Sequence, residues 1–200
     1  MYTFSKYFSE FVETFILDNN SEYLNEILKS IQNNFEYDSF ELILKQKGIR
    51  NIEDIKLESL DLLISYANFI LKDDIISGVE IQDFTFLKRI FKIREGDFVK
   101  NKNFAINEVL KKEFIRIYSD NHISEKETLL QLNLQSLFDL SYDEFEHLKK
   151  DEIINSLLQG ANPRDLDITK IPKGLNILYT TVYIRLAFFL EISDKSSQTY

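Results

Sequence analysis

Apolar side chains recur along most of this chain with the helical period of about 3.6 residues. The first such stripe covers residues 4–17, and the second follows Ser21, whose hydroxyl suits the N-terminal cap of a helix. A shorter stripe covers residues 39–47 and ends at Gly48, a residue type common at helix C-termini. The first two stripes contain Phe4, Phe8, Phe11, Val12, Phe15, Leu24, Ile27, Leu28 and Ile31. Since the chain has only two Pro and five Gly, the pattern predicts an all-α fold.

The pattern also repeats itself at a spacing of 47 residues. Residues 67–80 and residues 114–127 both read as the end of an apolar helix, an Asp, the motif Ile-Ser-x-x-Glu and the start of another apolar helix. The match continues from residues 87–98 to residues 134–145. Two similar helical hairpins usually pack face to face as one pseudo-symmetric core. The sequence therefore predicts two pseudo-repeated helical hairpins at the centre of the fold.

We expect one helical domain built around this duplication. Residues 1–56 supply N-terminal helices that pack on the core, and residues 57–150 form the duplicated core itself. Residues 151–192 add C-terminal helices with a Pro-containing connector, and residues 193–200 are predicted to be a disordered tail.

The C-terminal part contains the two segments that depart most from the helical pattern. Both prolines lie in residues 161–173, which we interpret as an extended connector on the surface. Residues 174–192 are the most apolar segment, but Arg185 and Glu191 interrupt them, so they are too short for a membrane span of about 20 apolar residues. We predict a buried final helix there. Association with a membrane surface is less favoured, because the segment lacks a Lys/Arg-rich face.

The net charge narrows the classes of partner. The chain carries 24 Lys and Arg against 33 Asp and Glu, a formal net charge of −9. Nucleic-acid binding usually needs a basic stripe, so we expect none. Metal ions, a basic protein partner or solubility alone would each account for the acidity. The absence of Cys excludes disulfides and Cys-ligated zinc, and the first residues lack the basic start of a secretory signal, so we expect a cytoplasmic protein.

The repeated Ser-x-x-Glu motif has the form of a capping box. In such a box the Ser hydroxyl accepts from the amide three residues later, and the Glu carboxylate accepts from the Ser amide. A cap of this kind contributes about 1 kcal/mol, which explains both copies without any function. It does not explain the Asp that precedes each Ser by four residues, Asp73 and Asp120.

These turns could hold a divalent cation if the two copies bring them together. Carboxylate oxygens suit Ca²⁺ or Mg²⁺, and a His would favour Zn²⁺ or another transition metal. The spacing differs from that of an EF-hand loop, which places acidic or amide ligands at alternate positions. The candidate metal ligands are Asp73, Asp74, Glu80, Asp120, His122 and Glu127.

Nothing in the chain matches a catalytic motif. There is no Gly-x-Ser-x-Gly elbow, phosphate-binding glycine loop or His-Glu-x-x-His. The two histidines, His122 and His147, are expected on the surface. Paired carboxylates for a hydrolase could come from helix starts, where the helix dipole favours acids in any case. Those carboxylates are Glu95, Asp97, Asp143 and Glu144. We expect no enzymatic activity.

The two turns resemble the TerB-like domain of bacterial tellurite-resistance and stress systems. The residues that carry the resemblance are 73–80, 120–127 and 137–141, and it covers about residues 57–150. The family often has Asp-Gly in the turn, where this chain has Asp74 and Asn121. The resemblance implies an all-helical, acidic, cytoplasmic or membrane-associated protein that acts as a metal-linked or scaffolding module.

The leading functional hypothesis is a non-enzymatic TerB-like module of a bacterial stress or defence system. Its acidic turns would bind a cation or a basic partner. The alternative is a metal-independent, protein-binding adaptor of phage or mobile-element origin. A carboxylate-based hydrolase is less favoured and would require a deep pocket lined by several acids.

Overall fold

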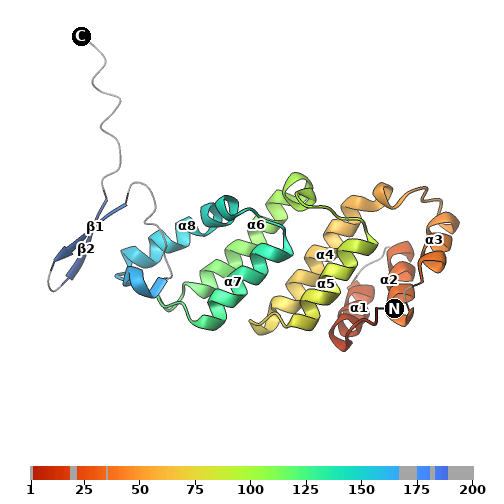
Figure 1. The fold of residues 1–200 in the computed structure, drawn as a ribbon, viewed down its shortest axis with the longest axis horizontal. Helices are drawn as coiled ribbons and strands as arrows, with labels where there is room; N and C mark the ends of the chain where they lie inside the picture. Colours follow the sequence, from red (N-terminus) through yellow and green to blue (C-terminus); the bar gives the residue numbers. More distant parts are fainter. Residues whose placement is uncertain (1, 19–21, 35, 167–174, 181–182, 189–200) are drawn as a thin grey trace, which may run out of the picture. The chain divides into compact units, whose positions relative to one another are not determined.

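The computed structural model describes residues 2–18, 22–34, 36–166, 175–180 and 183–188. Up to residue 166 every regular element described is helical, so the predicted all-α class is confirmed (Figure 1). The helices are α1 (Lys6–Asp18), α2 (Glu22–Asn34), α3 (Tyr37–Gln46), α4 (Lys56–Ile70), α5 (Gly78–Ile90), α6 (Asp97–Ile117), α7 (Glu125–Leu137) and α8 (Tyr142–Leu158). Two short 3-10 helices, η1 (Ile52–Ile55) and η2 (Leu71–Asp73), lie between these helices, and a third, η3 (Pro163–Leu166), follows α8.

The predicted duplication is visible in the backbone conformation. A short helical turn precedes the long helix of each copy, and a single non-helical residue separates the two. That residue is Ile55 in the first copy (φ −112°, ψ 23°) and Lys102 in the second (φ −134°, ψ 27°). The two positions are 47 residues apart, so the repeat read from the sequence is also a repeat of local structure.

The corners between helices repeat at the same spacing. Asp74 and Asn121 both adopt the left-handed conformation, with φ of 69° and 61°. Lys92 and Asp139, which follow the second helix of each copy, also do so, with φ of 50° and 52°. Non-glycine residues rarely adopt positive φ, so four of them at matched positions are strong evidence for two copies of one hairpin.

The described residues form two compact units. The first consists of residues 1–106 and 132–140, and the second of residues 107–131 and 141–200 as far as these are described. Helices α6 and α7 contribute one part to each unit.

The core of the first unit is rich in aromatic rings. Helix α1 contacts α4 and α5, and the ring of Phe8 meets that of Tyr66 edge to face at 5.6 Å. Phe84 on α5 lies at the centre, where its ring centroid is 6.2 Å from those of Tyr66 and Phe98 and 6.4 Å from that of Phe138. Pairs of aromatic rings contribute about 0.5–1.5 kcal/mol beyond the area that they bury.

The core of the second unit joins α6 and α8. The rings of Phe114 and Phe145 meet edge to face at 5.2 Å. Residues 161–173 are predicted from the sequence to be an extended connector, but Pro163–Leu166 form the 3-10 helix η3, in which Leu166 is buried, and residues 167–173 lie outside the described residues. The carbonyl of Asp165 accepts a hydrogen bond from the amide of Ile123 at 2.7 Å, so a backbone contact as well as an apolar side chain holds this segment on its unit.

The predicted C-terminal helix is wrong. Residues Leu175–Thr180 form strand β1 and Tyr183–Phe188 form strand β2, and the two pair antiparallel with Thr180 opposite Tyr183. A continuous apolar run does not by its period distinguish a buried helix from a strand. This run is rich in β-branched and aromatic residues, which favour strands. The predicted tail, residues 193–200, lies outside the described residues.

No helix in the described parts of the chain combines the length and the apolar character that crossing a membrane requires.

Candidate functional site

The repeated acidic corners are helix caps. In the first copy the Glu80 carboxylate accepts from the amide and the hydroxyl of Ser77, both at 2.7 Å, and the Glu80 amide donates to the Ser77 hydroxyl at 3.3 Å. In the second copy Glu127 and Ser124 make the same three bonds at 2.8, 2.7 and 3.3 Å. The capping boxes predicted from the sequence are therefore present at both corners.

The preceding aspartates also serve the backbone. The carboxylate of Asp73 accepts from the amide of Ile75 at 3.4 Å, and that of Asp120 accepts from the amide of His122 at 3.0 Å. Asx turns of this kind stabilise a change of chain direction. The repeated Asp, which the capping box left unexplained, thus has a structural role.

The six candidate metal ligands are not gathered into a site among the described residues. Asp73, Asp74, Asp120 and His122 are exposed, whereas Glu80 and Glu127 are held by their caps. Nowhere in the described ranges do three or more His, Asp or Glu side chains converge as a metal site requires. Cation binding at these corners stays a prediction.

The carboxylates considered for a hydrolase include two further caps. Hydrogen bonds from the Ser141 hydroxyl and amide lower the pKa of Glu144. Burial alone would raise the pKa of Asp97, but the amide of Arg94 and the ammonium of Lys56 outweigh it and lower the pKa overall. Both groups therefore stay ionised to lower pH than usual and stabilise helix starts.

Two large apolar side chains at equivalent positions of the repeat point to solvent. Leu57 on α4 is 52% exposed and Phe104 on α6 is 80% exposed, and they are 47 residues apart. The next apolar residue on α4, Leu60, is fully buried, whereas about half of the Leu57 side chain is exposed. We call Leu57 and Phe104 the apolar pair.

Two ion pairs within the first unit join the start of α4, which carries Leu57, to the start of α6, which carries Phe104. Lys56 Nζ lies 3.1 Å from Asp97 Oδ2, and Lys102 Nζ lies 2.7 Å from Asp61 Oδ1. Lys56 Nζ also lies 2.7 Å from Glu53 Oε2. Leu57 lies one helical turn before Asp61. The apolar pair therefore lies on two helix starts that are joined within one unit.

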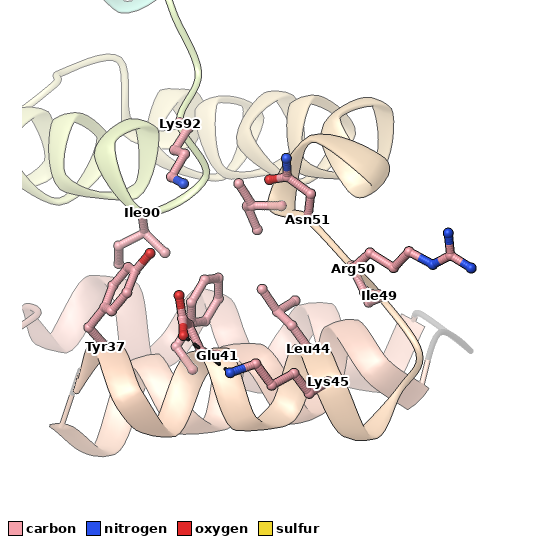
Figure 2. Close-up of a pocket in the computed structure, with 11 residues that line it drawn as sticks. Tyr37, Glu41, Leu44, Lys45, Ile49, Arg50, Asn51, Ile90 and Lys92 are labelled. Carbon is pink, nitrogen blue, oxygen red and sulfur yellow. Dashed lines mark ion pairs between the residues drawn. The ribbon is translucent and has the colours of Figure 1, made fainter.

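A second surface feature is an open hollow of about 90 Å³ beside α3 (Figure 2). It lies between α3, the chain that leads into α4, and the end of α5. Its floor is apolar and consists of the nearly buried side chains Phe40, Leu44, Ile52 and Ile90. We call this feature the basic hollow, for the charges on its rim.

The rim of the basic hollow carries three cations and one carboxylate. The carboxylate, Glu41, is already engaged, because Lys45 Nζ lies 3.5 Å away and a hydrogen bond to Glu41 raises the pKa of Tyr37. Figure 2 shows the Lys92 side chain pointing into the hollow, whereas Arg50 points away from it. Neither forms an ion pair within the described part of the chain. A single rim carboxylate that is already paired does not supply the acid and base that a hydrolase needs.

The first unit also contains a buried carboxylate that sequence analysis missed. Asp83 on α5 is fully buried, and it accepts hydrogen bonds from the Tyr2 hydroxyl at 2.7 Å and the Tyr66 hydroxyl at 3.3 Å. The amide and the hydroxyl of Ser5 donate to it as well. Ser5 is also the cap of α1, since its hydroxyl accepts from the amide of Phe8. Asp83 therefore fastens the start of α1 to α5.

Burial and the Asp83 carboxylate together raise the pKa of both tyrosines. For Tyr2 burial is the largest cause, followed by its hydrogen bond to Asp83. For Tyr66 burial is again the largest cause, followed by the charges of Asp83 and Glu80. Both phenols thus stay protonated donors in the folded protein.

Only one of the missed features left a signal in the sequence. The apolar pair could have been found, because Leu57 and Phe104 align in the repeat and fall outside its apolar stripe. The basic hollow and the Asp83 cluster combine residues far apart in sequence, such as Ser5 and Asp83, and no local pattern marks them.

No protein-family model, curated protein or solved structure matches this chain. The TerB-like resemblance therefore rests on the corner motifs and stays a prediction.

Proposed function

We propose that this protein is a non-enzymatic, helical interaction module that binds a protein partner through the apolar pair. The observation that carries the proposal is the exposure of large apolar side chains at the same position of both repeat copies. Single exposed apolar residues are ordinary on protein surfaces, but clustered ones mark interaction sites. The TerB-like assignment, with its bacterial stress or defence setting, belongs to this proposal and is supported by the repeated corners.

The ion pairs around the apolar pair support binding of a largely apolar partner surface. Because carboxylates hold both Lys56 and Lys102, neither ammonium is an unpaired charge beside the apolar pair. Interface centres are depleted in unpaired charges and enriched in aromatic side chains. Phe104 is the aromatic anchor that such a centre requires, and Leu57 extends it.

The proposal predicts that partner capture depends on the apolar pair. The full-length protein and its Leu57→Ser/Phe104→Ser variant are used to capture proteins from a lysate of the source cells in the presence of a chelator. A partner identified in this way is then purified and titrated against both proteins. We expect its affinity to fall at least about tenfold in the variant, since a central aromatic anchor is worth about 2 kcal/mol or more.

The matched control changes two other exposed apolar residues, Ile115 and Leu129, to Ser. Their side chains are 50% and 57% exposed, close to Leu57, but they are not equivalents in the repeat. Equal loss of affinity in both double variants would show that apolar exposure in general, and not the apolar pair, attracts the partner. Undiminished affinity in the Leu57→Ser/Phe104→Ser variant would remove the proposal.

Cation binding at the corners, predicted from the sequence, has a separate test, and the capping geometry leads us to expect a negative result. Because Glu80, Glu127, Asp73 and Asp120 already accept hydrogen bonds, we expect Ca²⁺, Mg²⁺ or Zn²⁺ at about 1 mM to leave the melting temperature unchanged within about 1 °C. Calorimetry of the same titrations should show no saturable heat. A saturable heat that disappears in an Asp73→Asn/Asp120→Asn variant would instead assign a cation to these corners.

A further inference from the structure

Four described helices end with the same motif, and Lys92 stands out among them. In each, the residue after the last turn is left-handed and the next amide donates to a carbonyl five residues earlier, as in a Schellman motif. The left-handed residues are Gly48, Lys92, Asp139 and Gly160. Glycine adopts this conformation without strain, whereas any other residue costs free energy.

Asp139 has a structural reason to replace glycine, and Lys92 has none within the described residues. The Asp139 carboxylate forms an ion pair with Lys88 in the first unit. The Lys92 ammonium reaches instead into the basic hollow, where it meets no carboxylate of the described chain (Figure 2). A strained position retained without structural compensation is a mark of a functional residue.

The charge of the hollow is opposite to that of the protein as a whole. The chain has a net charge of −9, yet the rim has three cations and one carboxylate, and Lys45 already pairs with that carboxylate. The charges that remain are Arg50 and Lys92. A carboxylate is the complementary group, and an ammonium holds it by a charge-assisted hydrogen bond.

The floor of the hollow determines which kind of side chain fits beside this carboxylate in a ligand. It is apolar, and its volume of about 90 Å³ is smaller than the cavity of about 150 Å³ that accepts benzene. The space therefore suits one aliphatic side chain rather than an aromatic ring.

We propose that the basic hollow binds a segment of a protein partner in which an aliphatic side chain stands next to Asp or Glu. The aliphatic side chain fills the apolar floor, and the carboxylate accepts a hydrogen bond from the Lys92 ammonium. This inference rests on the proposed role in protein binding but concerns a different surface from the apolar pair.

The test uses the full chain as bait for a display library of random peptides. Selected peptides are synthesised with a fluorescent label, and their dissociation constants are measured by anisotropy. We expect the enriched sequences to share Asp or Glu beside Leu, Ile or Val. The dissociation constant should rise about tenfold or more in Lys92→Gly, because one charge-assisted hydrogen bond is lost.

The Lys92→Gly variant separates binding from folding. Since glycine relieves the left-handed position, the variant should melt about 2 °C higher than the parent while it binds more weakly. Arg89→Ala is the control, because it removes an exposed cation from the same helix end that does not line the hollow. It should leave the peptide affinity within about twofold of the parent value.

Several outcomes would overturn the inference. They are a failure to enrich any peptide, enrichment of peptides without a carboxylate, and equal affinity for the parent and Lys92→Gly. Self-association of the chain that Lys92→Gly abolishes would assign the hollow to a second copy instead. The Leu57→Ser/Phe104→Ser variant should bind the selected peptides normally, so a failure here is distinguishable from a failure of the apolar pair.

Discussion

Replacing Phe84 by Ala is expected to lower the free energy of unfolding by about 4 kcal/mol, the largest single effect that we predict in this protein. Phe84 is 1% exposed, and its ring contacts those of Tyr66, Phe98 and Phe138. Truncation removes all three ring contacts and leaves a cavity that the surrounding helices fill only in part. Urea unfolding followed by circular dichroism at the helical band measures the change.

Phe104→Ala is the matched control for this substitution. It deletes the same side chain from a position that is 80% exposed, so the free energy of unfolding should change by no more than about 0.5 kcal/mol. The difference between the two variants isolates the effect of burial from that of helix propensity. A loss below about 1 kcal/mol in Phe84→Ala would contradict the central place of this ring in the first unit.

The elements predicted well from the sequence are those specified by contacts a few residues apart. Ser77 and Glu80 lie three positions apart, and the capping box that they form has a fixed sequence signature. The helices before and after each corner follow from the apolar period, and repetition at 47 residues strengthened each assignment. Local chemistry thus predicted the class of fold and the position of both corners.

The features that were missed depend on contacts between distant parts of the chain. The strands Leu175–Thr180 and Tyr183–Phe188 contain an apolar run whose pairing, not its period, distinguishes it from a helix. The basic hollow combines α3 with Lys92, more than 40 positions away. Lys92 looks like an ordinary surface cation in the sequence, and only its positive φ and its direction mark it as unusual.

The acidic corners show how a correct pattern led to an untested function. The spacing of Asp73, Ser77 and Glu80 is explained by an Asx turn followed by a capping box. Both arrangements place carboxylates where helix starts favour negative charge. Carboxylates that repeat along a sequence are therefore explained first by repeated helix starts, and a cation site needs further evidence.

Removing the buried carboxylate in Asp83→Ala is expected to cost about 3 kcal/mol of stability and to loosen the start of α1. The substitution leaves the hydroxyls of Tyr2 and Tyr66 and the amide of Ser5 without their acceptor. Unpaired buried donors each cost about 1–3 kcal/mol unless water or local opening relieves them. Hydrogen exchange should therefore accelerate at the amides of the first turn of α1 more than in α4.

Alkaline titration supplies an independent measurement of the same cluster. The pKa values of Tyr2 and Tyr66 are raised in the folded state, whereas the tyrosines of the unfolded chain ionise near pH 10. Their contribution to stability is thus fully present below pH 10 and declines as the pH rises above it. Asp83 contributes to both pKa shifts. The Asp83→Asn variant keeps the shape of the side chain but not its charge, so it should lower the pKa values of Tyr2 and Tyr66 toward their usual range.

The two variants together decide whether Asp83 acts as an acceptor or merely fills space. Asn keeps one oxygen that accepts from Ser5 or Tyr66 but replaces the second acceptor oxygen by an NH₂ group, which only donates, so Asp83→Asn should lose about 1–2 kcal/mol, less than Asp83→Ala. If the two variants unfold at the same urea concentration as the parent, the start of α1 is held by its aromatic contacts alone. Those contacts, such as Tyr2 with Phe86 on α5 at 4.3 Å, would then suffice without the buried charge.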